Sequence, residues 1–440
     1  MEQFNKLIEF RQAVFEHGFT KASDAQFELV DALLAGRPIR SFPELSLLPT
    51  FRRKWPSSYA AIEKGGQDWK WLEGYFIQQV STKGAQLFSL DGTAWPHPAV
   101  WTLVDRQYVF SPTSEVDEEA IVVGHLYSML AWVPERGSSW GLPVSIRRAL
   151  SQQTDVEVGI EQVRQLYRHR PAEMLKDLYL IIADAKYGNH RFLAPLKDEP
   201  CGVLVRMRRD RVLYGAPGAY SGRDRPRVHG ERFAFKESQT WGEPDAMVEL
   251  EHPRWGKVRL RRWDDKHARQ DADTSFSVIL VEAHLERERP SAPFWLGYQP
   301  PSHQKAEDQK LKDLWLWYEY RWPVEPSIRF RKQYLNWTLP RFQTAECCDR
   351  WTMLVSLAQW QLFLGRHLVK DKPLPWQPAQ ENPTPERVLQ GFGGLFREIG
   401  TPAAPPQTRG KSPGWPKGRP RTRPERHRVV KKGKKKPKPA

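Results

Sequence analysis

The spacing of hydrophobic and polar positions changes three times along the chain, and each spacing predicts a different kind of structure. In the first 80 residues, apolar side chains recur at helical intervals, as at Phe27, Val30 and Leu34. From about residue 86, short apolar runs alternate with helical segments, which predicts a mixed α/β sheet. Helical periodicity disappears between about residues 209 and 304 and returns after residue 306. The pattern therefore predicts helices, then an α/β region, an all-β insertion and a second helical region.

The individual elements follow from apolar runs and their boundaries. In the α/β region we expect a helix over 159–169 and strands over 87–91, 120–133, 178–184 and 203–206. In the insertion, Pro, Gly and Asp separate predicted strands at 247–250, 257–260, 276–283 and 294–296. The second helical region contains predicted helices at 306–320, directly after Pro323, and at 349–369.

These changes divide the chain into five segments. Residues 1–80 are expected to form a helical N-terminal domain, and residues 81–208 the first part of an α/β core. Residues 209–305 are the predicted β insertion, and residues 306–370 the helical second part of the core. Residues 371–440 are expected to be a Pro-rich basic tail. At 440 residues the chain is long enough for more than one hydrophobic core.

Positive charge is concentrated in the tail. The whole chain has 68 basic and 52 acidic residues, a net charge of +16. The last 40 residues contain eight Lys, six Arg and one acid, a net charge of +13, which leaves +3 for the rest of the chain. These 40 residues also hold nine of the 37 prolines. Such a segment buries too little apolar surface to fold, so we expect a disordered tail that binds nucleic acid.

Composition also narrows the class of protein. No run reaches the roughly 18 apolar residues that span a bilayer, and the first residues lack a signal-peptide pattern. Three cysteines are too few for a secreted disulfide framework, so we expect a cytoplasmic protein without membrane contact. The twelve histidines are scattered, and none lies at zinc-ligand spacing from a cysteine. A structural zinc site is therefore not expected.

Two acidic residues follow apolar runs in the predicted sheet. Asp91 comes after residues 87–90, and Asp184 comes after residues 178–183, the most apolar strand of the chain. Carboxylates at the ends of neighbouring strands point into the crevice where α/β folds bind ligands. Together with a third acid, they would form an oxygen-rich site for Mg²⁺ or Mn²⁺. Taken alone, the pair is equally consistent with solvated strand ends.

A longer pattern supplies the third acid. Tyr318, Arg321, Glu325 and Lys332 form the pattern Tyr-x2-Arg-x3-Glu-x6-Lys, with all spacings intact. Four fixed residues at about 5% usage each coincide by chance on the order of once in 10⁵ positions. This pattern resembles the signature of bacterial insertion-sequence transposases of the cut-and-paste type, which have a DDE catalytic triad. Residues 90–93, 124–128, 140–143 and 182–188 also resemble that family, so the resemblance extends over about residues 80–370.

The resemblance implies a fold, an activity and a set of site residues. Asp91, Asp184 and Glu325 would be the catalytic acids and would hold two Mg²⁺ or Mn²⁺ ions in an RNase H-like core. Tyr318, Arg321 and Lys332 would contact DNA phosphates near the cut. The protein would cut double-stranded DNA at the terminal repeats of its element and join the ends to target DNA. It would act as a homodimer in the bacterial cytoplasm, associated with the nucleoid.

Two alternatives to this function remain open at the level of the sequence. One is a metal-dependent DNA nuclease without strand transfer, and the other is a non-catalytic DNA-binding protein derived from a transposase. The sequence also departs from the family at one position, because Gly92 follows Asp91 where many relatives have a second Asp.

Further DNA contacts are suggested by two other features. A tryptophan of the insertion, Trp295 or alternatively Trp255, would stack on a flipped base, as in some relatives. In the tail, the segment that contains Lys417, Arg419 and Arg421 resembles an AT-hook, which binds the narrow minor groove of A·T-rich DNA. A generic basic linker explains that segment equally well.

Overall fold

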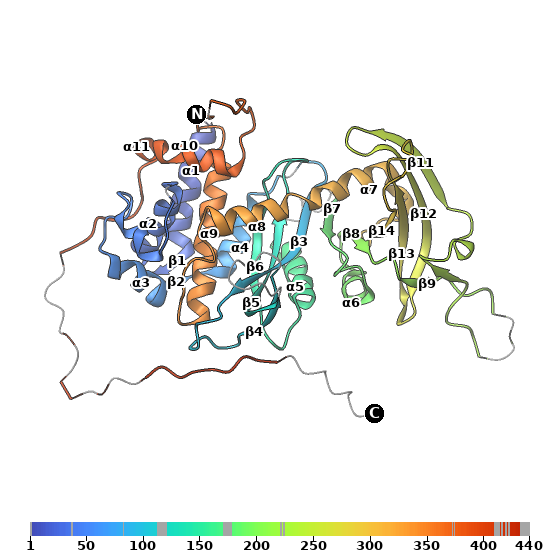
Figure 1. Cartoon of the computed structure of the whole chain (residues 1–440), viewed down its shortest axis with the longest axis horizontal. Helices are drawn as coiled ribbons and strands as arrows, with labels where there is room; N and C mark the ends of the chain where they lie inside the picture. The colour runs from blue at the N-terminus through green and yellow to red at the C-terminus, as the bar shows by residue number, and fades with distance from the viewer. Residues whose placement is uncertain are drawn as a thin grey trace.

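The structure is a computed structural model of the 440-residue chain. It describes the chain except for residues 1, 37, 82, 112–120, 170–177, 221, 223, 224, 372, 374, 409–413, 415, 416, 419, 421, 422 and 432–440. Figure 1 shows a helical region at one end, a mixed sheet in the middle and an extended group of strands at the other end. No helix in the described residues is both long enough and apolar enough to cross a membrane.

Helices dominate the N-terminal region, as the apolar spacing predicts. They are α1 (Glu2–Ala13), α2 (Ser23–Leu34), α3 (Trp55–Lys64) and α4 (Trp69–Gln78), with the π-helical turn η1 (Val14–Gly18) and the 3-10 turn η2 (Phe42–Leu47). A small antiparallel pair, β1 (Phe19–Lys21) and β2 (Gly66–Gln67), lies between them. Buried side chains such as Leu7 and Phe27 share one hydrophobic core with the long helix α9 (Ala345–Gly365). The N-terminal helices therefore pack directly onto the rest of the protein.

The central sheet is built around β3 (Gln86–Pro96). β3 pairs antiparallel with β5 (Ile121–Trp132) on one side and parallel with β7 (Tyr179–Ala183) on the other. β5 also pairs with β4 (Gln107–Phe110) and β6 (Leu142–Ala149), and β7 pairs in parallel with β8 (Gly202–Met207). The helix α5 (Asp155–Arg168) covers β5 and β6. It begins at Thr154, whose side chain forms a capping box with Glu157.

The strands of the insertion continue the same sheet. They are β9 (Val212–Tyr214), β10 (Arg232–Ala234), β11 (Ala246–His252), β12 (Gly256–Ala268), β13 (Asp271–Glu282) and β14 (Phe294–Gln299), with the 3-10 turn η5 (Ser238–Thr240). β14 pairs antiparallel with β8, so one sheet of twelve strands runs from the core into the insertion. The β character of this segment is as predicted, but the main-chain hydrogen bonds do not stop at its boundary.

The helical second part of the core returns the chain to the central sheet. It contains η6 (Ala306–Asp308), α7 (Leu311–Tyr318), η7 (Glu319–Arg321), α8 (Val324–Gln333) and α9. Two shorter elements, α6 (His190–Leu193) and η4 (Ala194–Leu196), connect β7 with β8, and α6 contacts α5 and β13. In Figure 1, α7 and α8 run from the insertion across the top of the central sheet toward α9.

The tail begins later than residue 371. Residues 385–399 form α10 (Pro385–Phe392), η8 (Gly393–Leu395) and α11 (Phe396–Ile399). Val388, Leu389 and Phe392 are buried in the core that includes α9. The prediction missed these helices because the sequence around them is rich in proline, and the single short apolar face of α10 does not stand out against it.

Parts of the remaining tail contact the folded body at two places. The Arg52 guanidinium donates a hydrogen bond to the carbonyl of Ala403 at 2.7 Å, and Ala403 itself is buried. Further on, the amide of Val430 donates to the carbonyl of Arg106 at 2.7 Å beside the edge strand β4. The described residues 423–431 therefore run along the sheet edge below the core (Figure 1).

Candidate active site

Asp91 and Asp184 lie side by side at the point where two parallel strands separate. The parallel pairing of β3 with β7 ends with Leu90 opposite Ala183, so the next residue on each strand is an aspartate. Both side chains are partly buried. One detail of the prediction is wrong, because Asp91 lies within β3 rather than at its end. On the other side of β3, pairing with β5 continues as far as Pro96.

Asp184 and Glu325 both lie close enough to Asp91 to affect its pKa, so the three predicted acids form one site. Burial raises the pKa of the Asp91 carboxyl from its ordinary value of 3.8 to about 6. The negative charges of Asp184 and Glu325 contribute to this rise in the pKa, and the positive charge of Arg321 opposes it. The amide of Gly92 donates a hydrogen bond of 2.7 Å to Asp91 Oδ1, which also favours the ionised form. Three carboxylates therefore repel one another at this edge of the sheet.

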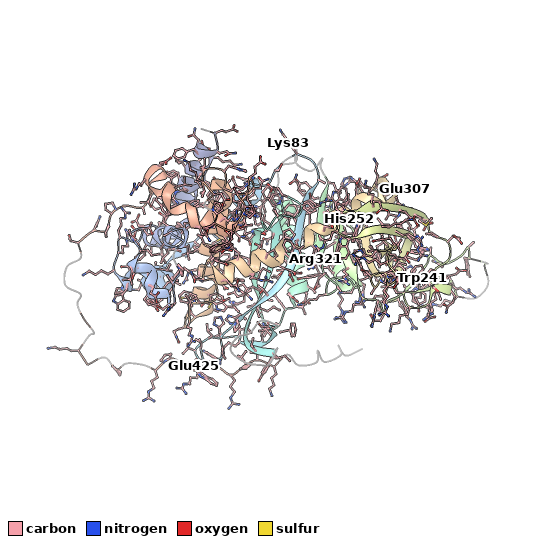
Figure 2. The ribbon with its side chains drawn as sticks, turned by 45° about the horizontal axis from the view of Figure 1, so that its top comes forward. Lys83, Trp241, His252, Glu307, Arg321 and Glu425 are labelled. Atoms are coloured by element: carbon pink, nitrogen blue, oxygen red, sulfur yellow. The ribbon has the colours of Figure 1, made fainter. Side chains whose placement is uncertain are left out.

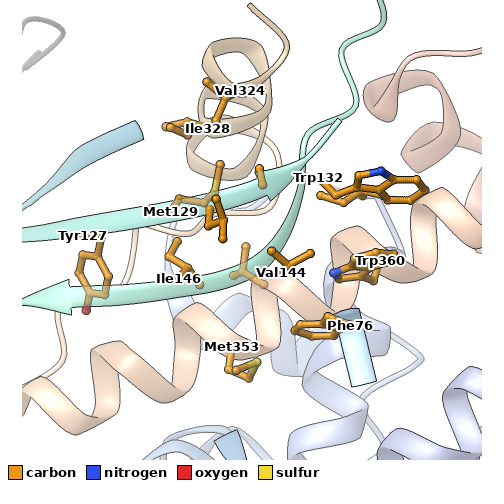
Figure 3. Close-up of a cluster of buried hydrophobic side chains, with 14 of the residues drawn as sticks. Phe76, Tyr127, Met129, Trp132, Val144, Ile146, Val324, Ile328, Met353 and Trp360 are labelled. Atoms are coloured by element: carbon orange, nitrogen blue, oxygen red, sulfur yellow. The ribbon is translucent and has the colours of Figure 1, made fainter. Parts of the chain in front are cut away.

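Glu325 reaches the site because α8 packs on the sheet with its opposite face. Val324 and Ile328 point from α8 onto the strands below, where Met129 and Ile146 belong to β5 and β6 (Figure 3). Glu325 is exposed on the other side of the same helix. Seven residues later, Lys332 lies on the same face as Glu325, since seven residues make nearly two helical turns. The predicted helix after Pro323 is thus present and carries both residues.

Buried polar contacts fix the position of α8. The hydroxyl of Ser327 donates to the carbonyl of Gly141 at 2.6 Å, and the amide of Gln359 in α9 donates to the same carbonyl at 2.9 Å. Arg331 is fully buried, donates to the Gln359 side chain at 3.1 Å and lies over the ring of Trp337 at 5.0 Å. Because these groups have no access to water, moving α8 would leave them unpaired. Glu325 is therefore held on a rigid support.

Three cationic or hydroxyl side chains surround the acids. Arg321 Nη1 lies 2.6 Å from Glu325 Oε1, and the turn η7 that carries Arg321 packs against β3 and β7. Figure 2 places Arg321 in the middle of the molecule, between the helical region and the insertion, which contains Trp241 and His252. Burial raises the pKa of the Tyr318 hydroxyl to about 12, and Arg321 and Asp184 are among the charges that act on it.

Lys332 lies close enough to Asp91 for the two charges to interact. Burial lowers the pKa of its ammonium group from 10.5 to about 8, and the charge that opposes this shift is that of Asp91. The structure therefore gathers Tyr318, Arg321 and Lys332, all three predicted phosphate contacts of the core, around the predicted acids.

A fourth acid was not predicted to lie near the site. Asp155, the first residue of α5, is buried and forms an ion pair with Lys186, two residues after Asp184. A Cβ atom on Gly92 would lie 2.6 Å from Asp155 Oδ2, a distance that real side chains do not adopt. The glycine after Asp91 thus leaves room for a carboxylate that comes from a different element. No local sequence pattern indicates this contact, because Gly92 and Asp155 are 63 residues apart.

The predicted contacts outside the core lie elsewhere. Trp295 is 3% exposed, and its ring stacks on Phe235 at 4.1 Å within an aromatic cluster, so this geometry leaves no face for a flipped base. Trp255 is partly buried and donates a hydrogen bond of 3.3 Å to Glu319, next to Tyr318. Trp322, which directly follows Arg321 in the sequence, is 45% exposed.

The proposed AT-hook is described only in part. Lys417 lies in an exposed turn of the tail, and Arg419 and Arg421 lie outside the described residues.

Comparison with known proteins identifies a family for the larger part of the chain. The model of the family described as DDE superfamily endonuclease matches residues 14–269, more than half of the chain. The matched part contains Asp91 and Asp184 and ends before Glu325. No curated protein matches the chain significantly.

Proposed function

We propose that this chain, which belongs to the DDE superfamily endonuclease family, is a DNA transposase of the insertion-sequence type. It would hydrolyse a phosphodiester at each end of its element and join the freed 3′-hydroxyl to target DNA. The observation that carries this proposal is the convergence of Asp91, Asp184 and Glu325, from two strands and a helix, in one electrostatic field. Members of the family are endonucleases. The proposal adds to this family assignment that the chain also transfers strands at transposon ends.

The chemistry of the three acids fits a divalent metal. Their donors are carboxylate oxygens, which Mg²⁺ and Mn²⁺ prefer. Asp91 is mostly buried, and its raised pKa reflects both burial and two negative neighbours, so a cation would relieve an unfavourable arrangement. Asp91, Asp184 and Glu325 would hold two such ions. Bound ions would make water a stronger nucleophile and stabilise the leaving oxygen of the phosphodiester.

The surrounding side chains would position the DNA strand. Arg321 presents a planar guanidinium, and Lys332 an ammonium group, at the edge of the acid cluster. Each would hold a phosphate oxygen near the scissile bond, with Tyr318 packed behind Arg321. Because the guanidinium of Arg321 contacts Glu325, it must exchange this carboxylate for phosphate when DNA binds.

The remaining segments would supply binding to longer DNA. We interpret β3–β8 with α5, α8 and α9 as the RNase H-like core and β9–β14 as its insertion. The N-terminal helices would recognise the terminal repeats, and the basic tail would bind DNA without sequence preference. Two protomers would hold the two ends of the element.

The test uses the purified full-length chain and duplexes that contain the DNA flanking its own gene. With Mg²⁺ we expect cleavage at the element ends, and with pre-cut ends we expect joining to a second duplex. Cleavage without joining would indicate a nuclease that does not transfer strands. Binding without cleavage or joining would indicate a non-catalytic DNA-binding protein and would refute the proposal.

A further inference from the structure

A second cluster of metal-ligating side chains lies just beyond the last residue of β3. His97 follows the last residue of β3, His125 belongs to β5 and Cys348 belongs to α9. All three are at least 98% buried, and one donor atom of each lies within 4.8 Å of the other two. His97 is six residues beyond Asp91, which corresponds to roughly 20 Å along an extended strand. The cluster is therefore separate from the acids.

Each of the two histidines turns a ring nitrogen toward this cluster. His125 Nε2 lies 3.0 Å from the carbonyl oxygen of Val104, so this nitrogen carries the proton and donates it. His125 Nδ1 is buried and, within the described chain, has no hydrogen-bond partner. Histidines that bind metals typically donate their other ring N–H to a carbonyl or carboxylate in this way. His97 Nε2 lies 3.8 Å from Cys348 Sγ.

Burial keeps the two histidine rings in the neutral form that can bind a metal, whereas it keeps the thiol protonated. Burial lowers the pKa of His97 to about 2 and also lowers that of His125, so both rings are neutral at physiological pH. Burial raises the pKa of the Cys348 thiol, which therefore must release its proton to solvent when a metal binds. Arg106 and Arg148 lie near the cluster, and an ion pair of 3.1 Å with Asp349 offsets the charge of Arg148. Asp105 also faces His125.

We propose that His97, His125 and Cys348 bind one Zn²⁺ ion that ties β3, β5 and α9 together. Imidazole nitrogen and thiolate sulfur are the donors that zinc prefers over oxygen-only ligands. In a tetrahedral site with bonds of about 2.0–2.3 Å, neighbouring donors are roughly 3.3–3.6 Å apart, close to the His97–Cys348 separation. Three protein ligands leave the fourth position to water. The ligands are 28 and 223 residues apart, so motif spacing does not indicate the site.

The chain contains a matched control for this site. Cys347 precedes Cys348 on α9, is also buried, and directs its thiol toward the carbonyl of Ile62 at 3.8 Å instead of toward the histidines. Zinc content is measured by elemental analysis after gel filtration. The parent protein is the Asp91→Asn, Glu325→Gln double variant, in which the acid cluster does not contribute to zinc binding. Cys347→Ser, Cys348→Ser and His125→Gln are then compared in that parent.

We expect about one zinc ion per chain in the parent and in Cys347→Ser, and less than about one tenth of that in Cys348→Ser and His125→Gln. Substitution with Co²⁺ should give a thiolate-to-cobalt charge-transfer band in the parent and in Cys347→Ser, but not in Cys348→Ser. If Cys348→Ser does not fold, the proposal is tested by the zinc content of His125→Gln and by the cobalt spectrum of the parent. A parent without zinc, a parent without the charge-transfer band, or zinc retained in Cys348→Ser would each overturn the proposal.

Discussion

Arg321 Nη1 lies 2.6 Å from Glu325 Oε1, so the third acid of the cluster already has a cationic partner from the preceding turn of the chain. This pair is partly solvated, with 46% of the Glu325 side chain exposed. Exposed pairs contribute little to stability, about 0–1 kcal/mol. The contact therefore contributes little to holding the fold, and under the proposed function it would place the guanidinium near the reacting phosphate.

Arg321→Ala should slow cleavage far more than it weakens DNA binding. Under the proposed function, the guanidinium would make a few of many phosphate contacts, but at the strand that reacts, where a misplacement of about 1 Å costs about 10²-fold in rate. Single-turnover cleavage and gel-shift affinity are compared for Arg321→Ala and for Arg341→Ala, an exposed arginine outside the cluster. Equal losses of rate and affinity in Arg321→Ala would show that Arg321 is a general DNA anchor.

The rate at low DNA concentration should depend on pH in a bell shape. This quantity reports the free enzyme. Asp91, with its pKa raised to about 6, loses its charge as the pH falls through 6, and Lys332, with its pKa lowered to about 8, loses its charge as the pH rises through 8. Lys332→Arg keeps a positive charge and should remove the alkaline limb alone, whereas Lys312→Arg on the exposed face of α7 should not. An unchanged alkaline limb in Lys332→Arg would assign that limb to another group.

Asp91→Asn should stabilise the fold at neutral pH. The carboxyl has a pKa near 6 in the folded chain and an ordinary value of 3.8, so the folded state binds this proton more tightly than the unfolded state. The ionised group therefore costs up to about 3 kcal/mol above pH 6, and this cost disappears as the pH falls below about 4. Thermal unfolding at pH 7.5 and pH 4 is compared with that of Asp198→Asn, an exposed acid. A lower melting temperature for Asp91→Asn at pH 7.5 would contradict the claim that the ionised Asp91 carboxylate destabilises the fold.

Removal of the basic tail should weaken sequence-independent DNA binding and leave cleavage intact. The truncation is made after Thr408, because Ala403 is buried and all +13 charges of the last 40 residues follow residue 408. Each phosphate that a protein neutralises contributes about −0.9 to the slope of log affinity against log salt, so partial engagement of the tail predicts a slope shallower by roughly 4 to 8.

Binding is measured on A·T-rich and G·C-rich duplexes at several salt concentrations. An unchanged slope would mean that the folded body makes the phosphate contacts. Equal losses on both duplexes would refute the AT-hook around Lys417 while leaving the general role of the tail intact.

Much of the fold follows from local patterns. Both faces of β7 are covered, so its residues are apolar throughout, and the run of residues 178–183 therefore predicts a buried strand. The seven-residue step from Glu325 to Lys332 indicates that both residues lie on one face of a helix. These features depend on neighbours along the chain. They also include the strands and the helix that carry the three predicted acids.

Features that depend on distant contacts are not visible in the sequence. The sheet continues from β8 into β14, which no pattern in either strand specifies. The room beside Gly92 depends on Asp155, and the burial of Trp295 depends on Phe235. The amphipathic face of α10 is hidden because its composition resembles that of the tail. In the first three cases, the deciding residue comes from a different element.

The most direct test of the account is Mg²⁺-dependent cleavage by Asp91→Asn, Asp184→Asn and Glu325→Gln, measured beside Asp198→Asn. Each amide is nearly isosteric with its acid but binds cations poorly, so DNA affinity should remain close to that of the unmodified chain. We predict that the three cluster variants lose cleavage, by at least about 10³-fold, whereas Asp198→Asn retains it. Substantial cleavage by any one of the three would contradict the assignment of that residue to the catalytic triad.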